Sequence, residues 1–313
     1  MNNNHVPISV LCLNPALDVT YEVPKFLPDR KNYARATRFD PGGNGLNVAR
    51  ALFRLQMDCL LIAPLAGETG RLIARLASGQ MAPPVFMEIQ GESRVNGTVI
   101  VEDPPLQFEI NGNGPALPKK VLERMKTLMA ASARGGYAIL TGSIPPGVPE
   151  DVYGEIAKEL SGETRVIVDA RASLLEKSLF ASPFFLKPNR HELSDLTGMQ
   201  IESAEEARQA AQKLRKQYGI SWVCVSLGEE GALLSGEEGT WRLTAPKVKV
   251  SSTVGAGDAM VAALTAGFAM GRTPAEILKL AVSCGSGTAA MPGTELFDPQ
   301  RLPATEEPEF MGH

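Results

Sequence analysis

Ser252–Asp258 reads STVGAGD and joins a β-branched run, Val248–Val254, to a run of small apolar residues that continues to Gly267. We expect a strand, a glycine turn and a helix that begins near Gly257. The helix has almost no polar face, which predicts that it is buried on all sides. Its free N–H groups and the positive end of its dipole would form an anion site beside Asp258. The alternative is an ordinary turn in which Asp258 caps the helix.

The 313 residues are 44% hydrophobic and 21% charged with a formal net charge of −4, which is typical of a soluble globular protein. No apolar run reaches the ~18 residues of a membrane span, and residues 1–7 lack the features of a signal peptide, so we expect a cytoplasmic protein. The four scattered cysteines predict reduced core residues. Only three histidines occur, which disfavours a histidine metal site or a catalytic triad. The lack of a Lys/Arg cluster argues against nucleic acid as a partner.

A second glycine turn, DPGGNGLN at residues 40–47, leads into an amphipathic helical pattern. It is not a dinucleotide-binding fingerprint, because Val48 stands where the third small residue belongs. The sequence also contains no G-x-x-x-x-G-K-[ST] phosphate loop. We interpret Gly42–Gly43 as a place where the backbone approaches a ligand, with the Asn47 amide offered to hydroxyl groups. The alternative is a plain loop in which Asn44 caps the following helix.

Strand-like and helix-like segments alternate regularly after Pro118. This alternation predicts an α/β fold, with a mainly parallel sheet covered by helices on both faces, in one domain over residues 6–304. Residues 305–313 form an acidic tail that we expect to be mobile. Ligands bind such sheets at the carboxyl ends of the strands. Polar or glycine residues follow these ends at Asp18, Ser143, Asp169, Asn189, Gly228 and Asp258.

Two segments, about 19–39 and 85–112, show hairpin and edge-strand patterns with little to bury their far face. We expect them to form a small sheet that stands off the body as a lid. Arg94 and Asn96 would lie where this lid approaches the body.

Asn189 and Glu192 lie one helical turn apart, directly after an expected strand at 184–187. If both face one pocket, their amide and carboxylate oxygens suit hydrated magnesium. The alternative is a capping pair at the start of a helix. Lys187, at the end of the strand, either meets a phosphate group or simply leads the chain into solvent.

Six motifs, in this order and over about residues 8–300, are similar to those of the ribokinase-like PfkB family of carbohydrate kinases. They are LNPALD (13–18), GGNGLNVA (42–49), TGSIPPG (141–147), KPNRHEL (187–193), VSLG (225–228) and TVGAGD (253–258). Together they resemble the phosphosugar branch, which includes 1-phosphofructokinase, the minor bacterial 6-phosphofructokinase and tagatose-6-phosphate kinase. The resemblance implies a three-layer α/β/α sandwich with a small β lid, and a homodimer through that lid.

The resemblance also implies roles for the matching residues. Asp258 would be the general base, and the turn of Gly255, Ala256 and Gly257 would supply the anion hole. The substrate and its existing phosphate would be held by Asp18, Lys31, Gly42, Gly43, Asn47, Arg94 and Ser143. The nucleotide site would include Lys187, Ser226, Gly228, Gly285 and Ser286, the last two near the adenine or a monovalent cation (K⁺). Asn189 and Glu192 would organise magnesium, largely through water.

Two of these positions have simpler alternatives, namely a solvated charge for Lys31 and helix packing for Ser286. The chain also departs from the family pattern at Tyr33, near where many 1-phosphofructokinases carry an arginine. Lys31 and Arg35 are the candidates to substitute for that arginine.

We therefore expect a kinase that uses ATP and Mg²⁺ to phosphorylate a hydroxyl of a phosphohexose, with fructose 1-phosphate converted to fructose 1,6-bisphosphate. Fructose 6-phosphate, tagatose 6-phosphate and an unphosphorylated sugar or nucleoside are alternative acceptors. A non-catalytic sugar-phosphate sensor is an alternative from a different class. A dehydrogenase is disfavoured, because the dinucleotide fingerprint and a suitable histidine are both missing. The expected partners are small molecules, with no membrane and no nucleic acid.

Overall fold

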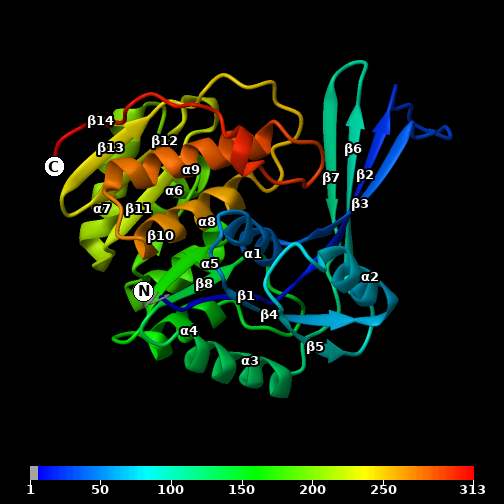
Figure 1. The fold of residues 1–313 in the computed structure, drawn as a ribbon, viewed down its shortest axis with the longest axis horizontal. Helices are drawn as coiled ribbons and strands as arrows, with labels where there is room; N and C mark the ends of the chain where they lie inside the picture. Colours follow the sequence, from blue (N-terminus) through cyan, green and yellow to red (C-terminus); the bar gives the residue numbers. More distant parts are fainter. Residues whose placement is uncertain (1–5) are drawn as a thin grey trace.

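The computed structural model describes residues 6–313 of the chain. The expectation about a signal peptide rests partly on residues 1–5, which lie outside the described residues. The body is a ten-stranded sheet in the order β14-β13-β12-β11-β10-β9-β8-β1-β4-β5 (Figure 1). Neighbours from β5 across to β11 pair in parallel, whereas β12, β13 and β14 pair antiparallel. The strands are β1 (Ile8–Cys12), β4 (Leu60–Ala66), β5 (Val85–Ile89), β8 (Tyr137–Thr141), β9 (Arg165–Asp169), β10 (Phe185–Leu186), β11 (Trp222–Ser226), β12 (Ala232–Gly236), β13 (Gly239–Leu243) and β14 (Glu309–Phe310).

Helices cover both faces of this sheet, which confirms the predicted three layers. One apolar cluster joins the sheet to α1, α2, α8 and α9, and a second joins it to α3 through α7. Strand residues alternate between the clusters, as Val10 and Leu11 do on β1. The helices are α1 (Asn44–Arg54), α2 (Gly67–Ala77), α3 (Lys119–Ser132), α4 (Val152–Leu160), α5 (Ala172–Ser178), α6 (Arg190–Thr197), α7 (Ala204–Tyr218), α8 (Ala256–Ala269) and α9 (Pro274–Ala289), with 3₁₀ turns at Leu179–Ala181, Gly228–Glu230 and Pro299–Arg301.

A separate four-stranded sheet, called the small sheet below, stands out from the body (Figure 1). Its order is β3 (Ala36–Gly42), β2 (Ala16–Val23), β6 (Arg94–Val101) and β7 (Leu106–Asn111). The expected second segment was too long, because Val85–Ile89 pairs with β4 in the main sheet. The first residues of β2 are buried, and β2 pairs with β3 on one side and β6 on the other.

Helix α8 is buried along most of its length, as its lack of a polar face predicted. It begins at Ala256, after Gly255 with φ 81°, and its residues from 258 to 267 are all buried. The strand expected at 248–254 was wrong, because this segment joins no described sheet and leaves Val250 59% exposed. β-Branched residues favour strands only where neighbouring backbone and side chains are present to pair with them.

The acidic tail, which we expected to be mobile, contains the short strand β14. Glu309–Phe310 pairs antiparallel with β13, with Phe310 opposite Trp241. The two rings lie 5.3 Å apart between centroids. Apolar ring contact and ladder hydrogen bonds together hold this short segment on the sheet.

Candidate active site

The two glycine turns predicted from the sequence meet at the carboxyl edge of the sheet, where α1 packs against α8. Each turn has a glycine in the left-handed region directly before its helix, Gly43 with φ 92° and Gly255 with φ 81°. Asp258 lies in the first turn of α8 and is only 5% exposed. Its carboxylate accepts hydrogen bonds from the amides of Asn44 and Asn47, at 2.9 Å each.

The alternative interpretations, in which Asp258 and Asn44 cap their own helices, are therefore wrong. The residue before α8 is Gly255, not Asp258, and the residue before α1 is Gly43, not Asn44. Neither Asp258 nor Asn44 caps its own helix. Each side chain instead reaches the other helix, so that the pair joins α1 to α8.

A cleft of about 530 Å³ opens over Asp258, between the carboxyl ends of the strands and the base of the small sheet. Most of the predicted site residues line it, namely Asp18, Gly43, Asn47, Arg94, Ser143, Lys187, Asn189, Glu192, Ser226, Gly255, Gly257 and Asp258. The remaining predicted residues do not line it, namely Lys31, Gly42, Gly228, Ala256, Gly285 and Ser286. The strand ends and the two glycine turns thus converge on one site.

Asp258 is electrostatically suited to exchange a proton. Burial raises the pKa of its carboxyl to about 7, and the negative charge of Asp169 adds to this rise. The amide of Asn47, the charge of Lys187 and the amide of Asn44 act in the opposite direction, because they stabilise the carboxylate. A carboxyl that titrates near neutral pH can act as a general base at that pH.

The first turn of α8 lines the cleft with Gly257 and Asp258. The N–H of Ala256 donates to the Thr253 carbonyl at 3.3 Å. Among the described residues, no backbone carbonyl accepts the N–H of Gly257 or Asp258. A Cβ placed on Gly257 would lie 3.4 Å from Lys187 Nζ, so an ammonium group adjoins the same turn. The arrangement can stabilise an anion.

Lys187 and Asp169 form a buried ion pair, 3.1 Å between Nζ and Oδ1. Lys187 does not lead into solvent, because only 7% of its side chain is exposed. Burial opposes its charge, but the fields of Asp169 and Glu192 outweigh that effect and raise the pKa of the ammonium group. The lysine therefore stays charged beside the turn before α8.

Asn189 and Glu192 form the capping pair that was the simpler alternative, and they also line the cleft. The Glu192 N–H donates to Asn189 Oδ1 at 2.9 Å, and the Asn189 N–H donates to Glu192 Oε2 at 2.8 Å. Burial raises the pKa of Glu192. No group of three or more His, Cys, Asp or Glu in the described part of the chain could hold a metal directly. The donors present are amide and carboxylate oxygens, which fit a hydrated magnesium ion.

Asp18 lies at the opposite side of the cleft, at the start of the small sheet. The amide of Asn96 donates to its Oδ1 at 2.8 Å. Burial raises the pKa of Asp18 to about 6, although Asn96 and Arg94 favour the charged form. Gly42 does not line the cleft, and a Cβ placed on it would lie 2.0 Å from Asp18 Oδ2. Because Gly42 has no side chain, the Asp18 carboxylate can pack against it.

Arg94 and Ser143 meet at the base of the small sheet through Asn14. Arg94 Nε donates to the Asn14 carbonyl at 3.0 Å, and the Asn14 amide donates to Ser143 Oγ at 3.3 Å. Lys31 is exposed in the loop between β2 and β3, outside the cleft. Nearby Tyr33 is 78% exposed. The family resemblance implies that Ser143, Arg94 and Lys31 hold the phosphate of the substrate, and of these only Ser143 and Arg94 line the cleft.

The expected nucleotide residues are more widely spread. Ser226 lines the cleft and forms an isolated parallel β-bridge with Asn189. Gly228 begins the 3₁₀ turn after β11. Gly285 and Ser286 lie on α9. A Cβ on Gly285 would come within 2.7 Å of Met260 Cγ, so this glycine lets α9 approach α8.

Sequence reasoning missed several residues of the cleft, above all Asn44 and Arg171 as site residues. Arg171 is exposed and forms an ion pair with Glu150, 3.4 Å between Nη2 and Oε1. Asn44 and Asn47 are three residues apart, and that spacing in a helix places them on one face. Arg50 was also missed; it is buried and donates to Asn47 Oδ1 at 3.3 Å. Burial lowers the pKa of its guanidinium to about 10.

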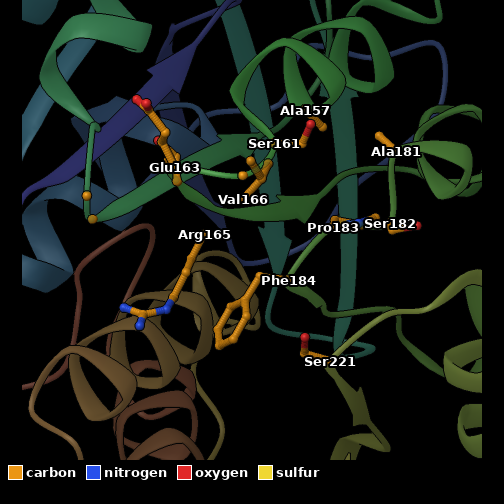
Figure 2. Close-up of a pocket in the computed structure, with 14 residues that line it drawn as sticks. Ala157, Ser161, Glu163, Arg165, Val166, Ala181, Ser182, Pro183, Phe184 and Ser221 are labelled. Atoms are coloured by element: carbon orange, nitrogen blue, oxygen red, sulfur yellow. The ribbon is translucent and has the colours of Figure 1, made fainter.

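A second cavity of about 340 Å³ lies at the opposite edge of the sheet, at the amino ends of β8 to β11 (Figure 2). Arg165 stacks there on Phe184, with 5.9 Å from Cζ to the ring centroid, and Glu163 points away from both. None of the residues predicted for the site lines this cavity. Over residues 6–313, no helix is both long and apolar enough to span a bilayer.

Comparisons with known proteins agree with this geometry. The profile of the family described as pfkB family carbohydrate kinase matches residues 9–301. The chain is 35% identical over 303 residues to the 1-phosphofructokinase of Bacillus subtilis (strain 168), which covers 95% of this chain and 97% of that protein. It is 32% identical to the ATP-dependent 6-phosphofructokinase isozyme 2 of Escherichia coli (strain K12), over 93% of this chain and 95% of the relative.

Comparison with solved structures also finds a phosphofructokinase. The crystal structure of phosphofructokinase-2 from Escherichia coli in complex with substrates and products aligns with a TM-score of 0.90 at 32% identity, over 94% of this chain and 96% of that chain. The profile match spans nearly the whole chain, and the relatives exceed 30% identity over similar lengths. The chain therefore belongs to the pfkB family of carbohydrate kinases.

Proposed function

We propose that the protein transfers the γ-phosphoryl group of ATP to a hydroxyl of a phosphohexose, with fructose 1-phosphate as the acceptor and fructose 1,6-bisphosphate as the product. One observation carries this proposal. Asp258, whose pKa lies near 7, stands beside free N–H groups and a charged lysine in one cleft. A base beside an anion-stabilising turn is the arrangement that phosphoryl transfer to an alcohol requires. With ATP as the donor, we place the reaction in the cytoplasm.

In the proposed reaction, the Asp258 carboxylate accepts the proton of the acceptor hydroxyl. The hydroxyl oxygen then forms a bond to the γ-phosphorus, and the bond from that phosphorus to the bridging oxygen breaks to release ADP. The N–H groups of Gly257 and Asp258 face the negative charge on the transferring group, with Gly255 allowing the turn. Lys187 lies next to the same turn and would meet the phosphate oxygens of the nucleotide.

Magnesium would be held by Asn189 and Glu192, largely through water, with the Asp169 carboxylate in the same cleft. When bound with ATP, the ion neutralises phosphate oxygens during transfer. Ser226 and Gly228 would line the nucleotide site. We also assign a K⁺ ion to the neighbourhood of Gly285 and Ser286, supported by the solved complex of Escherichia coli phosphofructokinase-2 with potassium. Rates that are equal in K⁺ and tetramethylammonium buffers would contradict that assignment.

On the acceptor side, we assign Asp18, Gly43 and Asn47 to the sugar hydroxyls. Arg94 and Ser143 would bind the phosphate that the sugar already carries, because they bring a charge and a hydroxyl to the same end of the cleft. Lys31 would reach this phosphate only if the small sheet closes over the cleft as a lid. Closure would also exclude water, which otherwise competes as an acceptor.

A substrate panel tests the proposed function. Purified protein is given ATP, MgCl₂ and one acceptor at a time, and ADP release is followed in a coupled assay. We expect the highest kcat/KM with fructose 1-phosphate, lower values with fructose 6-phosphate and tagatose 6-phosphate, and the lowest with fructose or nucleosides. Preference for an unphosphorylated acceptor would overturn the assignment. Tight binding without turnover would instead indicate a sugar-phosphate sensor.

We further propose that the protein is a homodimer joined through the small sheet. The sheet exposes large apolar side chains, with Ile110 71% and Leu106 50% exposed. Such side chains clustered on one sheet are typical of an interaction surface. Light scattering should give twice the chain mass for the wild type, and Ile110→Glu should shift it toward the monomer. A monomeric wild type at micromolar concentration would exclude this dimer.

A further inference from the structure

Asn44 holds an unusual place between the two glycine turns. It is the first residue of α1, and its half-buried side chain lines the cleft. Gly142, with φ 91°, supports it from the end of β8, since a Cβ there would lie 3.2 Å from Asn44 Cβ. Its Nδ2 donates to Asp258 Oδ1 at 2.9 Å. The side chain is therefore packed on one side and bonded on the other.

The two asparagines of α1 each donate a hydrogen bond to a different oxygen of the Asp258 carboxylate. Asn47 donates to Oδ2 of Asp258, and its own Oδ1 accepts from Arg50 at 3.3 Å. Asn44 donates to Oδ1, and both asparagines line the cleft. Each carboxylate oxygen has two acceptor sites, so one site on each stays open for a substrate hydroxyl.

We propose that Asn44 is a positioning residue for Asp258, fixing the plane of the carboxylate and favouring its charged form before substrate binds; this inference rests on the proposed function. A single donor would leave the carboxylate free to rotate about its bond to Cβ. Two donors, three residues apart on one helix, hold both oxygens in place. A hydrogen bond to a carboxylate also lowers its pKa, which offsets part of the rise caused by burial.

Other charged groups also face Asp258, and the test must separate their effects from that of Asn44. Asp169, the last residue of β9, raises the pKa of Asp258, and Lys187, which follows β10, lowers it. The other charged side chains that line the cleft are Asp18, Arg94, Arg171 and Glu192, and Arg50 lies buried behind Asn47. Helix α9 faces the turn before α8 with Thr288 and Gly285, neither of which titrates. Substitution of Asn44 changes none of these groups.

The experiment is a titration of the aspartate side chains by ¹³C NMR on the full chain, with the Asp258 signal assigned from Asp258→Asn. Asn44→Leu keeps a similar shape without the donor, and Asn44→Ala serves if the leucine variant does not fold. We expect the Asp258 midpoint to rise by about one pH unit in either variant. Asn44→Asp adds a negative charge and should raise it further. An Asp258 midpoint equal to that of the wild type would overturn the proposal.

Asn96 provides a matched control, because its amide donates to a different carboxylate of the cleft, that of Asp18. Asn96→Leu should move the Asp18 midpoint and leave that of Asp258 unchanged, while Asn44→Leu should do the reverse. A general loosening of the cleft would move both midpoints in both variants, and that result would contradict a specific role for Asn44.

Kinetics link this role to catalysis. The acidic limb of kcat/KM should move to higher pH in Asn44→Leu by the same amount as the Asp258 midpoint, since that limb reports the base of the free enzyme. A limb that stays in place, in an enzyme that turns over, overturns the role of Asn44 and leaves the proposed function intact. A wild type that phosphorylates no acceptor overturns the proposed function, while the titration still tests the bond from Asn44 to Asp258.

Discussion

Two of the buried carboxylates that line the cleft, Asp258 and Asp18, are carried by different kinds of structure. Asp258 stands on α8, a helix buried in the body, and accepts two amides from α1. Asp18 stands on β2 of the small sheet, accepts one amide from β6 and packs against Gly42. The proposed proton acceptor, Asp258, thus stands on helices of the body, whereas Asp18, the carboxylate proposed to bind the sugar, stands where closure of the small sheet would change its surroundings. Chemistry needs fixed geometry, and substrate entry needs a surface that can move.

The largest expected effect separates chemistry from binding at these two residues. Asp258→Asn should lower kcat by about 10²–10⁴-fold with little change in KM, because a general base acts mainly in the transition state. Asp18→Asn should raise KM for the sugar by roughly tenfold or more, because it weakens a hydrogen bond to a charged group. Steady-state kinetics on both variants measures the split. An equal loss of kcat in both would mean that the two carboxylates do not differ in role.

A smaller effect tests which cation of the small sheet meets the substrate phosphate. Arg94→Gln should raise KM for fructose 1-phosphate by about 10–100-fold, since a charge-assisted contact to phosphate is lost. Lys31→Gln is the matched control; its side chain lies outside the cleft and should change KM less than about threefold. If Lys31→Gln has the larger effect, the loop between β2 and β3 closes further than this structure indicates.

The smallest effect is on stability. Burial raises the pKa of Asp258 to about 7, from an ordinary value of 3.8. Between these values the unfolded chain has lost a proton that the folded chain keeps, so this carboxyl's contribution to the free energy of unfolding is full below about pH 4 and is lost as the pH rises to 7. Asp258→Asn has no such proton, so the stability of the variant relative to wild type should increase with pH, by at most about 1.4 kcal/mol per pH unit.

Urea denaturation at several pH values between 4 and 8 measures this change. The pKa of Asp18 is raised to about 6, so for Asp18→Asn the gain relative to wild type should level off at a lower pH. A stability difference that does not vary with pH for either variant would contradict the raised pKa values.

Much of the fold could be predicted from local pattern. The run of small apolar residues up to Gly267 predicted the buried helix α8. The alternation of strand-like and helix-like segments after Pro118 predicted a mainly parallel sheet with helices on both faces. The strand expected at 248–254 failed, because β-branched residues report a local preference and no strand lies there to pair with them.

The site was predictable where a residue acts within its own turn, and less so where it acts across the fold. Asn189 and Glu192 form the local pair that their spacing indicates, and they also line the cleft. Asn44 was interpreted as a cap, which is the ordinary local role of asparagine before a helix. Its actual partner lies 214 residues away in the chain, and no local pattern encodes that contact.

The short strand β14 has a consequence for the association state of the protein. Without Glu309 and Phe310, strand β13 would be the end of the main sheet and would present an open row of backbone donors and acceptors. Such rows recruit strands from other molecules and begin aggregation. The tail thus covers part of the open edge of β13, and contact between the Phe310 and Trp241 rings holds it there.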